Sequence, residues 1–117
     1  MNIEEIRNYC LAKPGVTEGL PFGEDTLVFK VVEKLFLLTS ISQNNSFNVK
    51  CDPERAIELR ERYSEVQPGY HMNKKHWNTV ATDGSLGRRE LCDMIDHSYE
   101  LVLKSLPKNL QAEISRL

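Results

Sequence analysis

Hydrophobic and polar residues alternate with a period of two between residues 26 and 51. Leu27, Phe29 and Val31 fall on one face of an extended chain, and their neighbours fall on the other. Two polar turns interrupt the alternation, the first at Glu33-Lys34 and the second at residues 42–45. The pattern predicts an antiparallel meander of three strands, over residues 26–32, 35–41 and 46–51.

Two helices are predicted from apolar spacing and capping residues. Asn2 and Glu5 form a capping pair, and the Pro14-Gly15 pair ends the helix that follows. Asp52-Pro53 begins a second helix, because aspartate caps free N–H groups and proline fits the first turn. Between the first helix and the meander, residues 16–25 are predicted to be a loop. The apolar positions of the two helices are Ile3, Ile6 and Cys10, then Ala56, Leu59 and Tyr63.

The rest of the chain predicts two more strands and two more helices. Pro68-Gly69 interrupts residues 66–72, so this strand is short or bulged, whereas residues 77–82 form a better one. Ser85 is the predicted cap of the longest helix, and Pro107 separates that helix from a final short one. Leu91, Ile95, Ser98 and Val102 line one face of the longest helix, and Leu110, Ile114 and Leu117 mark the final one.

The predicted order of elements is α-β-β-β-α-β-β-α-α. Hairpin-connected strands with helices between them indicate the α+β class. We expect two layers, an antiparallel five-stranded sheet with helices on one face. A chain of 117 residues suits a single domain over residues 1–117.

Composition indicates where the protein resides more than what it does. The chain is 40% hydrophobic and 27% charged, as in ordinary globular proteins. It has three cysteines without a close pair, no signal-peptide pattern at its start, and no apolar run longer than residues 35–38. We therefore expect a cytoplasmic protein with reduced thiols and no membrane partner.

Histidine and serine residues offer little support for metal binding or catalysis. His71 and His76 lie five positions apart without a nearby cysteine, so two partly exposed histidines are a better interpretation than a zinc site. Asp96, His97 and Ser98 are consecutive on a predicted helix, where neighbours point about 100° apart and do not face one another. The sequence contains no GxSxG motif, no HExxH motif and no phosphate-binding glycine loop. We expect no enzyme activity, no cofactor and no metal.

Charge is segregated along the chain. The net charge of −2 counts mildly against a dedicated nucleic-acid binder. Residues 70–89, however, hold two lysines and two arginines against one aspartate, a formal charge of +3, which leaves −5 for the remainder. A basic surface could contact phosphates, and an exposed aromatic ring could stack on a base. The candidate nucleic-acid contacts are Lys30, Lys50, Lys74, Lys75, His76, Arg88 and Arg89.

A structural interpretation of these residues is open as well. Lys30, Lys50 and Asn48 share the polar side of their strands, where lysines keep a sheet soluble. Trp77 is the only tryptophan, and a lone tryptophan usually packs in the core. We expect Trp77 to pack partly under the last helices, and Lys74 and Lys75 to be exposed in a turn between two strands.

Four segments together resemble the MmcQ/YjbR family of small bacterial proteins. They are PFGEDTLVFKV, VKCDPERAIELRERY, VQPGYHMNKKHWNTV and LCDMIDHSYELV, in this order. The resemblance runs to about Lys108 and implies an α-β(3)-α-β(2)-α fold related to type III secretion chaperones. It also implies a double-wing, DNA-binding description. The chain departs from the common family pattern at two places. Glu33 puts an acid on the turn that would form a wing, which counts against DNA binding, whereas Arg88-Arg89 adds positive charge where acids are common, which counts in its favour.

Three functions follow from the sequence. The first is weak, non-catalytic DNA binding through the basic turn and the sheet lysines. The second is a chaperone-like protein–protein interaction module, including a homodimer, that uses an exposed sheet face or edge. The third is a small-molecule or enzyme role, which requires a concave pocket with convergent polar groups and perturbed titrating residues.

Overall fold

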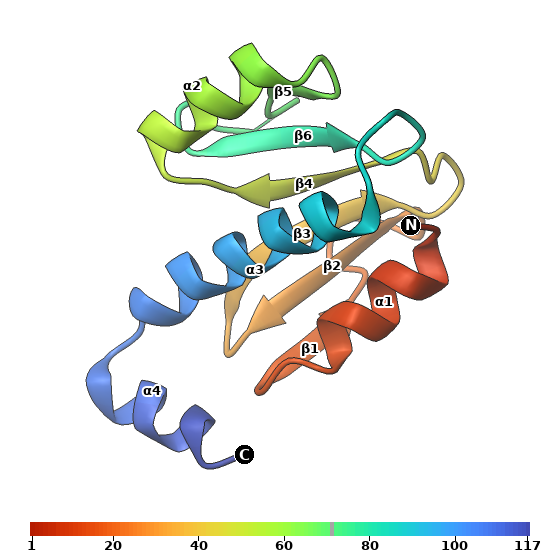
Figure 1. The fold of residues 1–117 in the computed structure, drawn as a ribbon. Coiled ribbons are helices and arrows are strands. Elements are labelled where there is room, and N and C mark those ends of the chain that lie inside the picture. Colours follow the sequence, from red (N-terminus) through yellow and green to blue (C-terminus); the bar gives the residue numbers. More distant parts are fainter. Residues whose placement is uncertain (71) are drawn as a thin grey trace.

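A computed structural model describes residues 1–70 and 72–117 of the chain. It confirms the α+β class: an antiparallel sheet lies against helices that cover one of its faces (Figure 1). The helices are α1 (Ile3–Leu11), α2 (Pro53–Arg62), α3 (Arg88–Lys104) and α4 (Lys108–Ser115). The strands are β1 (Val16–Gly19), β2 (Thr26–Val31), β3 (Lys34–Ser40), β4 (Ser46–Lys50), β5 (Val66–Pro68) and β6 (Trp77–Ala81).

The sheet of the described residues has six strands, so the prediction of five was wrong. The additional strand is β1, which lies in the segment expected to be a loop and pairs with β2 from Val16↔Val31 to Gly19↔Val28. It is short and carries little apolar surface, which is why the period-two pattern does not reveal it. The element order is therefore α-β-β-β-β-α-β-β-α-α, and the strand order in space is β1-β2-β3-β4-β6-β5.

Capping side chains mark the start of α1 and α2, whereas α3 and α4 begin without one. Asn2 and Glu5 form the expected capping box on α1, and the side chain of Asp52 accepts two backbone N–H bonds at the start of α2. The prediction that Ser85 caps α3 was wrong, because α3 begins at Arg88 after Gly87 without a side-chain cap. The Ser85 side chain donates to the carboxylate of Glu65 instead.

The hairpin between β2 and β3 turns one residue earlier than expected. β2 ends at Val31 and β3 begins at Lys34, so the turn is Val32-Glu33 rather than Glu33-Lys34. Val32 has φ 58°, a left-handed conformation that a β-branched side chain rarely adopts. The turn is therefore strained at Val32, and the strain is kept because the two strands that it joins are well packed.

The hydrophobic core lies between the sheet and helices α1, α2 and α3. Phe29 and Phe47 point from the sheet into this layer and are fully buried, as is Ile95 on α3. Phe36 and Tyr99 meet edge to face, with ring centroids 5.5 Å apart. Ser98 is also fully buried, as expected for a small residue where helix and sheet approach closely.

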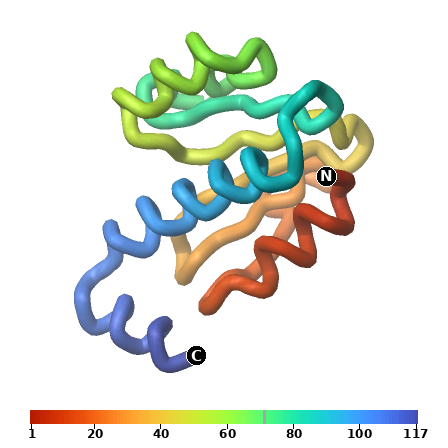
Figure 2. The backbone as a smooth tube through the Cα atoms, in the orientation of Figure 1, coloured from red at the N-terminus to blue at the C-terminus, as the bar shows by residue number. Residues whose placement is uncertain are grey.

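The C-terminal helix covers one end of the domain. Figure 2 shows α4 folding back beyond the end of α3, apart from the N-terminus. Ile114 of α4 is buried beside Gly15, where an added Cβ would lie 3.3 Å from the Ile114 side chain. Gly15 has φ +76°, so glycine serves both the chain reversal into β1 and this close contact. No helix among the described residues is long and apolar enough to cross a membrane.

Candidate binding groove

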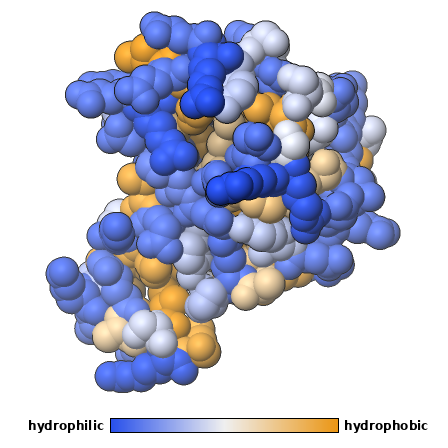
Figure 3. Space-filling model, viewed as in Figure 1, coloured by the Kyte–Doolittle hydropathy of each residue, from blue (hydrophilic) through white to orange (hydrophobic). Residues whose placement is uncertain are grey.

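No described helix covers the second face of the sheet, here called the open face. Its side chains alternate with the core residues along each strand. The central residues of the open face are Thr26, Val28 and Lys30 on β2, Leu38 and Ser40 on β3, Ser46, Asn48 and Lys50 on β4, and Trp77 and Thr79 on β6. Figure 3 shows the helical side, where hydrophilic residues predominate and apolar residues appear over α2 as well as in a strip near α4.

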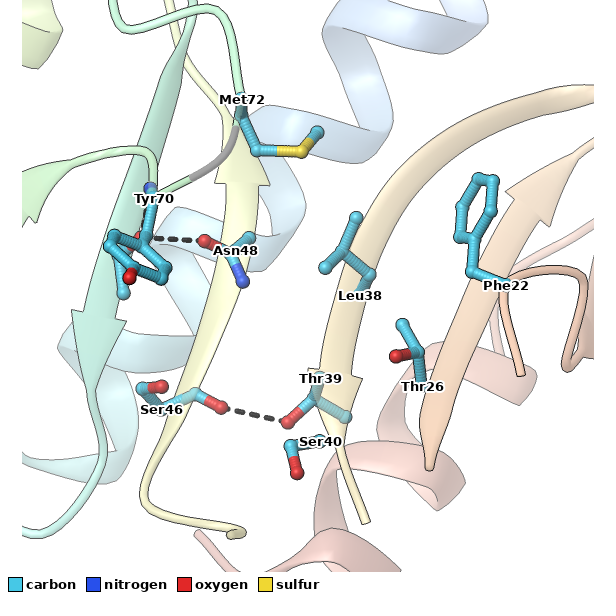
Figure 4. Close-up of a pocket in the computed structure, with 10 residues that line it drawn as sticks. Phe22, Thr26, Leu38, Thr39, Ser40, Ser46, Asn48, Tyr70 and Met72 are labelled. Atoms are coloured by element: carbon cyan, nitrogen blue, oxygen red, sulfur yellow. Dashed lines mark hydrogen bonds between the residues drawn. The ribbon is translucent and has the colours of Figure 1, made fainter. Parts of the chain in front are cut away.

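A groove of about 600 Å³ lies on the open face between two loops. The loop before β2 supplies Phe22 on one side, and the loop after β5 supplies Tyr70 and Met72 on the other, with Leu38 between them (Figure 4). No charged side chain lines the groove among the described residues. The full set is Phe22, Thr26, Leu38, Thr39, Ser40, Ser46, Asn48, Tyr70, Met72 and Thr79.

Hydrogen bonds across β4 and β6 position the Tyr70 side of the groove. The backbone N–H of Tyr70 donates to Thr79 Oγ1 at 3.0 Å, and Thr79 Oγ1 donates to Asn48 Oδ1 at 2.5 Å. The backbone N–H of Gly69 also donates to the carbonyl of Trp77. Because Asn48 Oδ1 faces Thr79, the Asn48 amide nitrogen points away from it along the groove (Figure 4). The groove thus offers an amide donor on its floor.

A glycine turn presents the Phe22 side of the groove. Gly23 has φ +121°, which is open to glycine alone without strain, and its N–H reaches the carbonyl of Leu20 at 3.4 Å. Phe22 is 67% exposed and Tyr70 is 71% exposed. Two large aromatic side chains are therefore presented to solvent on opposite sides of one groove.

Asp25 forms a fixed acidic rim at the end of the groove where β2 begins. Its carboxylate accepts from the Ser40 hydroxyl at 2.7 Å and from the backbone N–H of Ser42 at 2.8 Å. These hydrogen bonds, that from Ser40 first, lower the pKa of Asp25, so the rim stays negatively charged at neutral pH.

Five of the seven candidate basic residues lie at the other end of the open face. Lys30 and Lys50 project from the ends of β2 and β4, and Lys50 is paired with Trp77. The exposed Lys74 and Lys75 and the half-buried His76 follow in the adjoining turn, where the N–H of Cys51 donates to the carbonyl of His76. These five residues, Lys30, Lys50, Lys74, Lys75 and His76, are here called the basic end.

The turn of the basic end is anchored by Arg60 on α2. The Arg60 guanidinium donates to Asn78 Oδ1 at 2.7 Å and to the carbonyls of Lys74 and Trp77. Trp77 is half-buried on the open face, whereas its neighbour Asn78 is buried on the helical side. The expectation that Trp77 packs under the last helices was therefore wrong.

Arg88 and Arg89 lie elsewhere. They begin α3, on the helical side and at the end of the sheet opposite to the basic end (Figure 1). Arg88 pairs with Glu5 of α1 at 2.7 Å, and Arg89 is exposed. The seven basic residues do not form one surface, because β6 carries the chain from the basic end to the opposite end of the sheet before α3 begins on the helical side.

Asp96, His97 and Ser98 point to three different partners. Asp96 accepts from Tyr9 at 2.7 Å and pairs with Lys13. His97 Nε2 accepts from the backbone N–H of Asp52 at 3.1 Å, and burial, followed by the charge of Arg55, lowers its pKa. The three residues thus fasten α3 to its neighbours and do not form a nucleophile–base pair.

Ser98 joins α3 to two strands. Its hydroxyl donates to the carbonyl of Phe36 on β3 at 2.6 Å and accepts from the backbone N–H of Lys50 on β4 at 2.8 Å. β3 and β4 pair directly only at Leu37↔Val49 and Leu38↔Asn48, so the serine satisfies backbone groups where the strands separate.

Thiol and metal chemistry find little support in the described part of the chain. Burial raises the pKa of the Cys10 thiol to about 12 and that of Cys51 to about 11, so both are protonated at neutral pH. Among residues 1–70 and 72–117, no group of three or more potential ligands could hold a metal ion. The pair formed by His71 and His76 falls partly outside the described residues, because His71 does.

Sequence reasoning missed the two sides of the groove. Phe22 lies in the sequence Leu20-Pro21-Phe22-Gly23, where a large aromatic residue within a turn is itself a sign of exposure. Tyr70 and Met72 follow Pro68-Gly69 in the same manner. Only the folded sheet reveals that these two loops face each other across it.

The fold and the groove together define an α+β protein with one helix-covered sheet face and one open, grooved face. A sequence model of the YjbR family matches residues 11–101, and the chain belongs to this family. The resemblance found in the sequence is thereby confirmed.

Bacterial relatives agree with this assignment. The Escherichia coli K12 protein YjbR is 36% identical over 109 residues, covering 92% of each chain. The YbdF protein of Escherichia coli O157:H7 is 36% identical over 112 residues, covering 95% of this chain and 92% of that one.

Solved structures share the fold. The crystal structure of Deinococcus radiodurans protein DR2400 has a TM-score of 0.90 and 38% identity, covering 97% of this chain and 88% of that one. A crystal structure from Pseudomonas syringae has a TM-score of 0.75 and 27% identity, covering 87% and 99%. The names of these proteins assign no ligand or reaction.

Proposed function

We propose that this protein binds a segment of another protein chain in the groove of the open face and performs no catalysis. One observation carries the proposal: exposed Phe22 and Tyr70 stand on opposite sides of an uncharged groove of about 600 Å³. Aromatic residues and methionine are enriched, and charged residues depleted, at the centres of protein interfaces. The groove has this composition, with Met72 and Leu38 beside the aromatic residues.

Selection from a random peptide library tests this function. We expect peptides that bind the wild type and lose at least tenfold in affinity for Phe22→Ala combined with Tyr70→Ala, since buried aromatic anchors each contribute more than about 1 kcal/mol. The variant Arg88→Ala with Arg89→Ala, on the other side of the molecule, is the matched control. Selected peptides that bind wild type and groove variant equally would contradict the proposal.

DNA binding is a second candidate function, favoured by the basic end. Lys30, Lys50, Lys74 and Lys75 adjoin the open face, and Trp77 lies among them. Lysines that contact phosphates give an affinity that falls steeply with salt, and an aromatic ring can stack on a base.

Fluorescence anisotropy with a labelled duplex and a labelled single strand, at about 50 and 200 mM salt, separates this candidate from the first. DNA binding predicts affinity that weakens with salt and is lost on Lys74→Glu combined with Lys75→Glu. Charge reversal at Arg88 and Arg89 serves as the control at a distant basic pair. No binding at the lower salt would eliminate this candidate and leave the first unaffected.

A further inference from the structure

The open face has an electrical polarity along the strands. β2 and β4 are each antiparallel to β3, so they run in the same direction. Their first residues, Thr26 and Ser46, lie at the end where Asp25 forms the acidic rim, and Lys30 and Lys50 lie at the other end. A ligand lying along β4 therefore meets an uncharged groove and then Lys50, while Lys30 lies two strands away on β2, near Glu33 of the next turn.

The length of this path fits a short extended peptide. A strand rises about 3.3 Å per residue, so the distance from Ser46 to Lys50 is roughly 13 Å, or about four residues of an extended ligand. An apolar side chain of the ligand placed between Phe22 and Tyr70 leaves one or more residues within reach of the basic end.

The groove floor offers a hydrogen-bond donor suited to a peptide backbone. The Asn48 amide oxygen is engaged by Thr79 Oγ1 at 2.5 Å, and its amide nitrogen points along the groove (Figure 4). An amide N–H₂ recognises an acceptor, and a peptide carbonyl is the acceptor that every residue of an extended ligand carries. Because the Thr79–Asn48 hydrogen bond occupies the amide oxygen, the Asn48 side chain presents a donor to the ligand. That donor would bind a carbonyl oxygen of the ligand at the centre of the groove.

We infer that the partner segment is an extended peptide with an apolar residue followed or preceded by acidic residues, its apolar side chain between Phe22 and Tyr70 and its carboxylates at Lys30 and Lys50. This inference rests on the proposed function and specifies the chemistry of the partner. Complementary charge raises the association rate and selects among apolar segments that would otherwise fit equally.

Synthetic peptides of matched sequence test the inference, with Trp77 emission and the anisotropy of a peptide label as readouts. One peptide carries a Leu-Phe pair next to three glutamates, a second has glutamines in place of the glutamates, and a third has lysines. At low salt we expect the glutamate peptide to bind about tenfold more tightly than the glutamine peptide, because two exposed ion pairs contribute about 1 kcal/mol or slightly more together. The lysine peptide is expected to bind most weakly.

Two variants assign the effect to its residues. Lys30→Glu combined with Lys50→Glu is expected to reverse the preference in favour of the lysine peptide, whereas Arg88→Glu combined with Arg89→Glu is expected to leave it unchanged. Asn48→Leu keeps the approximate size of the side chain, removes its donor without adding a charge, and is expected to weaken all three peptides. Circular dichroism of each variant checks that the fold is retained.

The outcomes distinguish this inference from the proposed function. Equal binding of the glutamate and glutamine peptides, still lost on Phe22→Ala with Tyr70→Ala, would overturn the acidic preference and leave the proposed function standing. Failure of all three peptides, with peptides selected from the library also insensitive to the groove variant, would overturn both. Tight binding of an oligothymidylate that competes with the glutamate peptide would overturn the inference in favour of nucleic acid.

Discussion

The two faces of the sheet are formed by the same strands but differ in the burial and the type of their side chains. On the helical side, Phe29 and its neighbours are fully buried, and buried polar groups such as Ser98 have hydrogen-bond partners. On the open face, threonine, serine and asparagine accompany Leu38, and large aromatic residues stand exposed on the flanking loops. Packing in the core accounts for the apolar residues of the helical side. It does not account for the exposed aromatic residues that flank the open face.

The comparison predicts that stability resides on one side and binding on the other. Phe29→Ala is expected to destabilise the fold by about 3–5 kcal/mol, because it leaves a cavity in the core. Phe22→Ala is expected to change stability by less than about 0.5 kcal/mol, since the side chain is 67% exposed. Urea denaturation of both variants measures the difference. A large loss of stability in Phe22→Ala would mean that this ring supports the fold rather than a ligand.

A matched pair of serines, one on each face, tests the same difference for polar groups. Ser98→Ala leaves the Phe36 carbonyl and the Lys50 N–H without their partner, and is expected to cost about 2 kcal/mol. Ser46→Ala on the open face is expected to cost less than about 0.5 kcal/mol. Hydrogen exchange at Lys50 should accelerate only in Ser98→Ala. Equal protection of Lys50 in both variants would show that the serine does not hold α3 to β4.

Much of the helical side could be predicted from the sequence, and little of the open face. The core positions of β2, β4 and α3 repeat with periods that burial imposes, so Phe29, Phe47 and Ile95 could be placed without a structure. β1 has no such period, since it is a short edge strand stabilised by pairing with β2. Lys74 and Arg88 lie in one basic segment of the sequence, but the direction of β6 carries the chain to the end of the sheet opposite Lys74 before α3 begins at Arg88.

The groove could not be predicted, because it depends on two loops far apart in the sequence. Phe22 and Tyr70 meet the same surface only because β2 and β6 belong to one sheet with β3 and β4 between them. The hydrogen bond from Thr79 to Asn48, which orients the groove floor, joins residues on separate strands. No local pattern encodes such a contact, whereas capping at Asn2 or Asp52 is encoded within a few residues.

The smallest expected effect concerns strain in the hairpin on the open side. Val32 has φ 58°, and a left-handed conformation costs a residue other than glycine or asparagine about 1–2 kcal/mol. Val32→Asn is therefore expected to raise the free energy of unfolding by about 1 kcal/mol, because asparagine tolerates this conformation and Val32 is 37% exposed. Glu33→Asn, in the same turn but without a positive φ, is the control and is expected to give no gain in the free energy of unfolding.

Val32 also borders a shallow hollow beside Lys30. A stabilised Val32→Asn variant that keeps its affinity for the glutamate peptide would therefore show that this strain has no part in binding. Stabilisation accompanied by a loss of affinity would instead mean that the strained turn shapes the open face for its ligand.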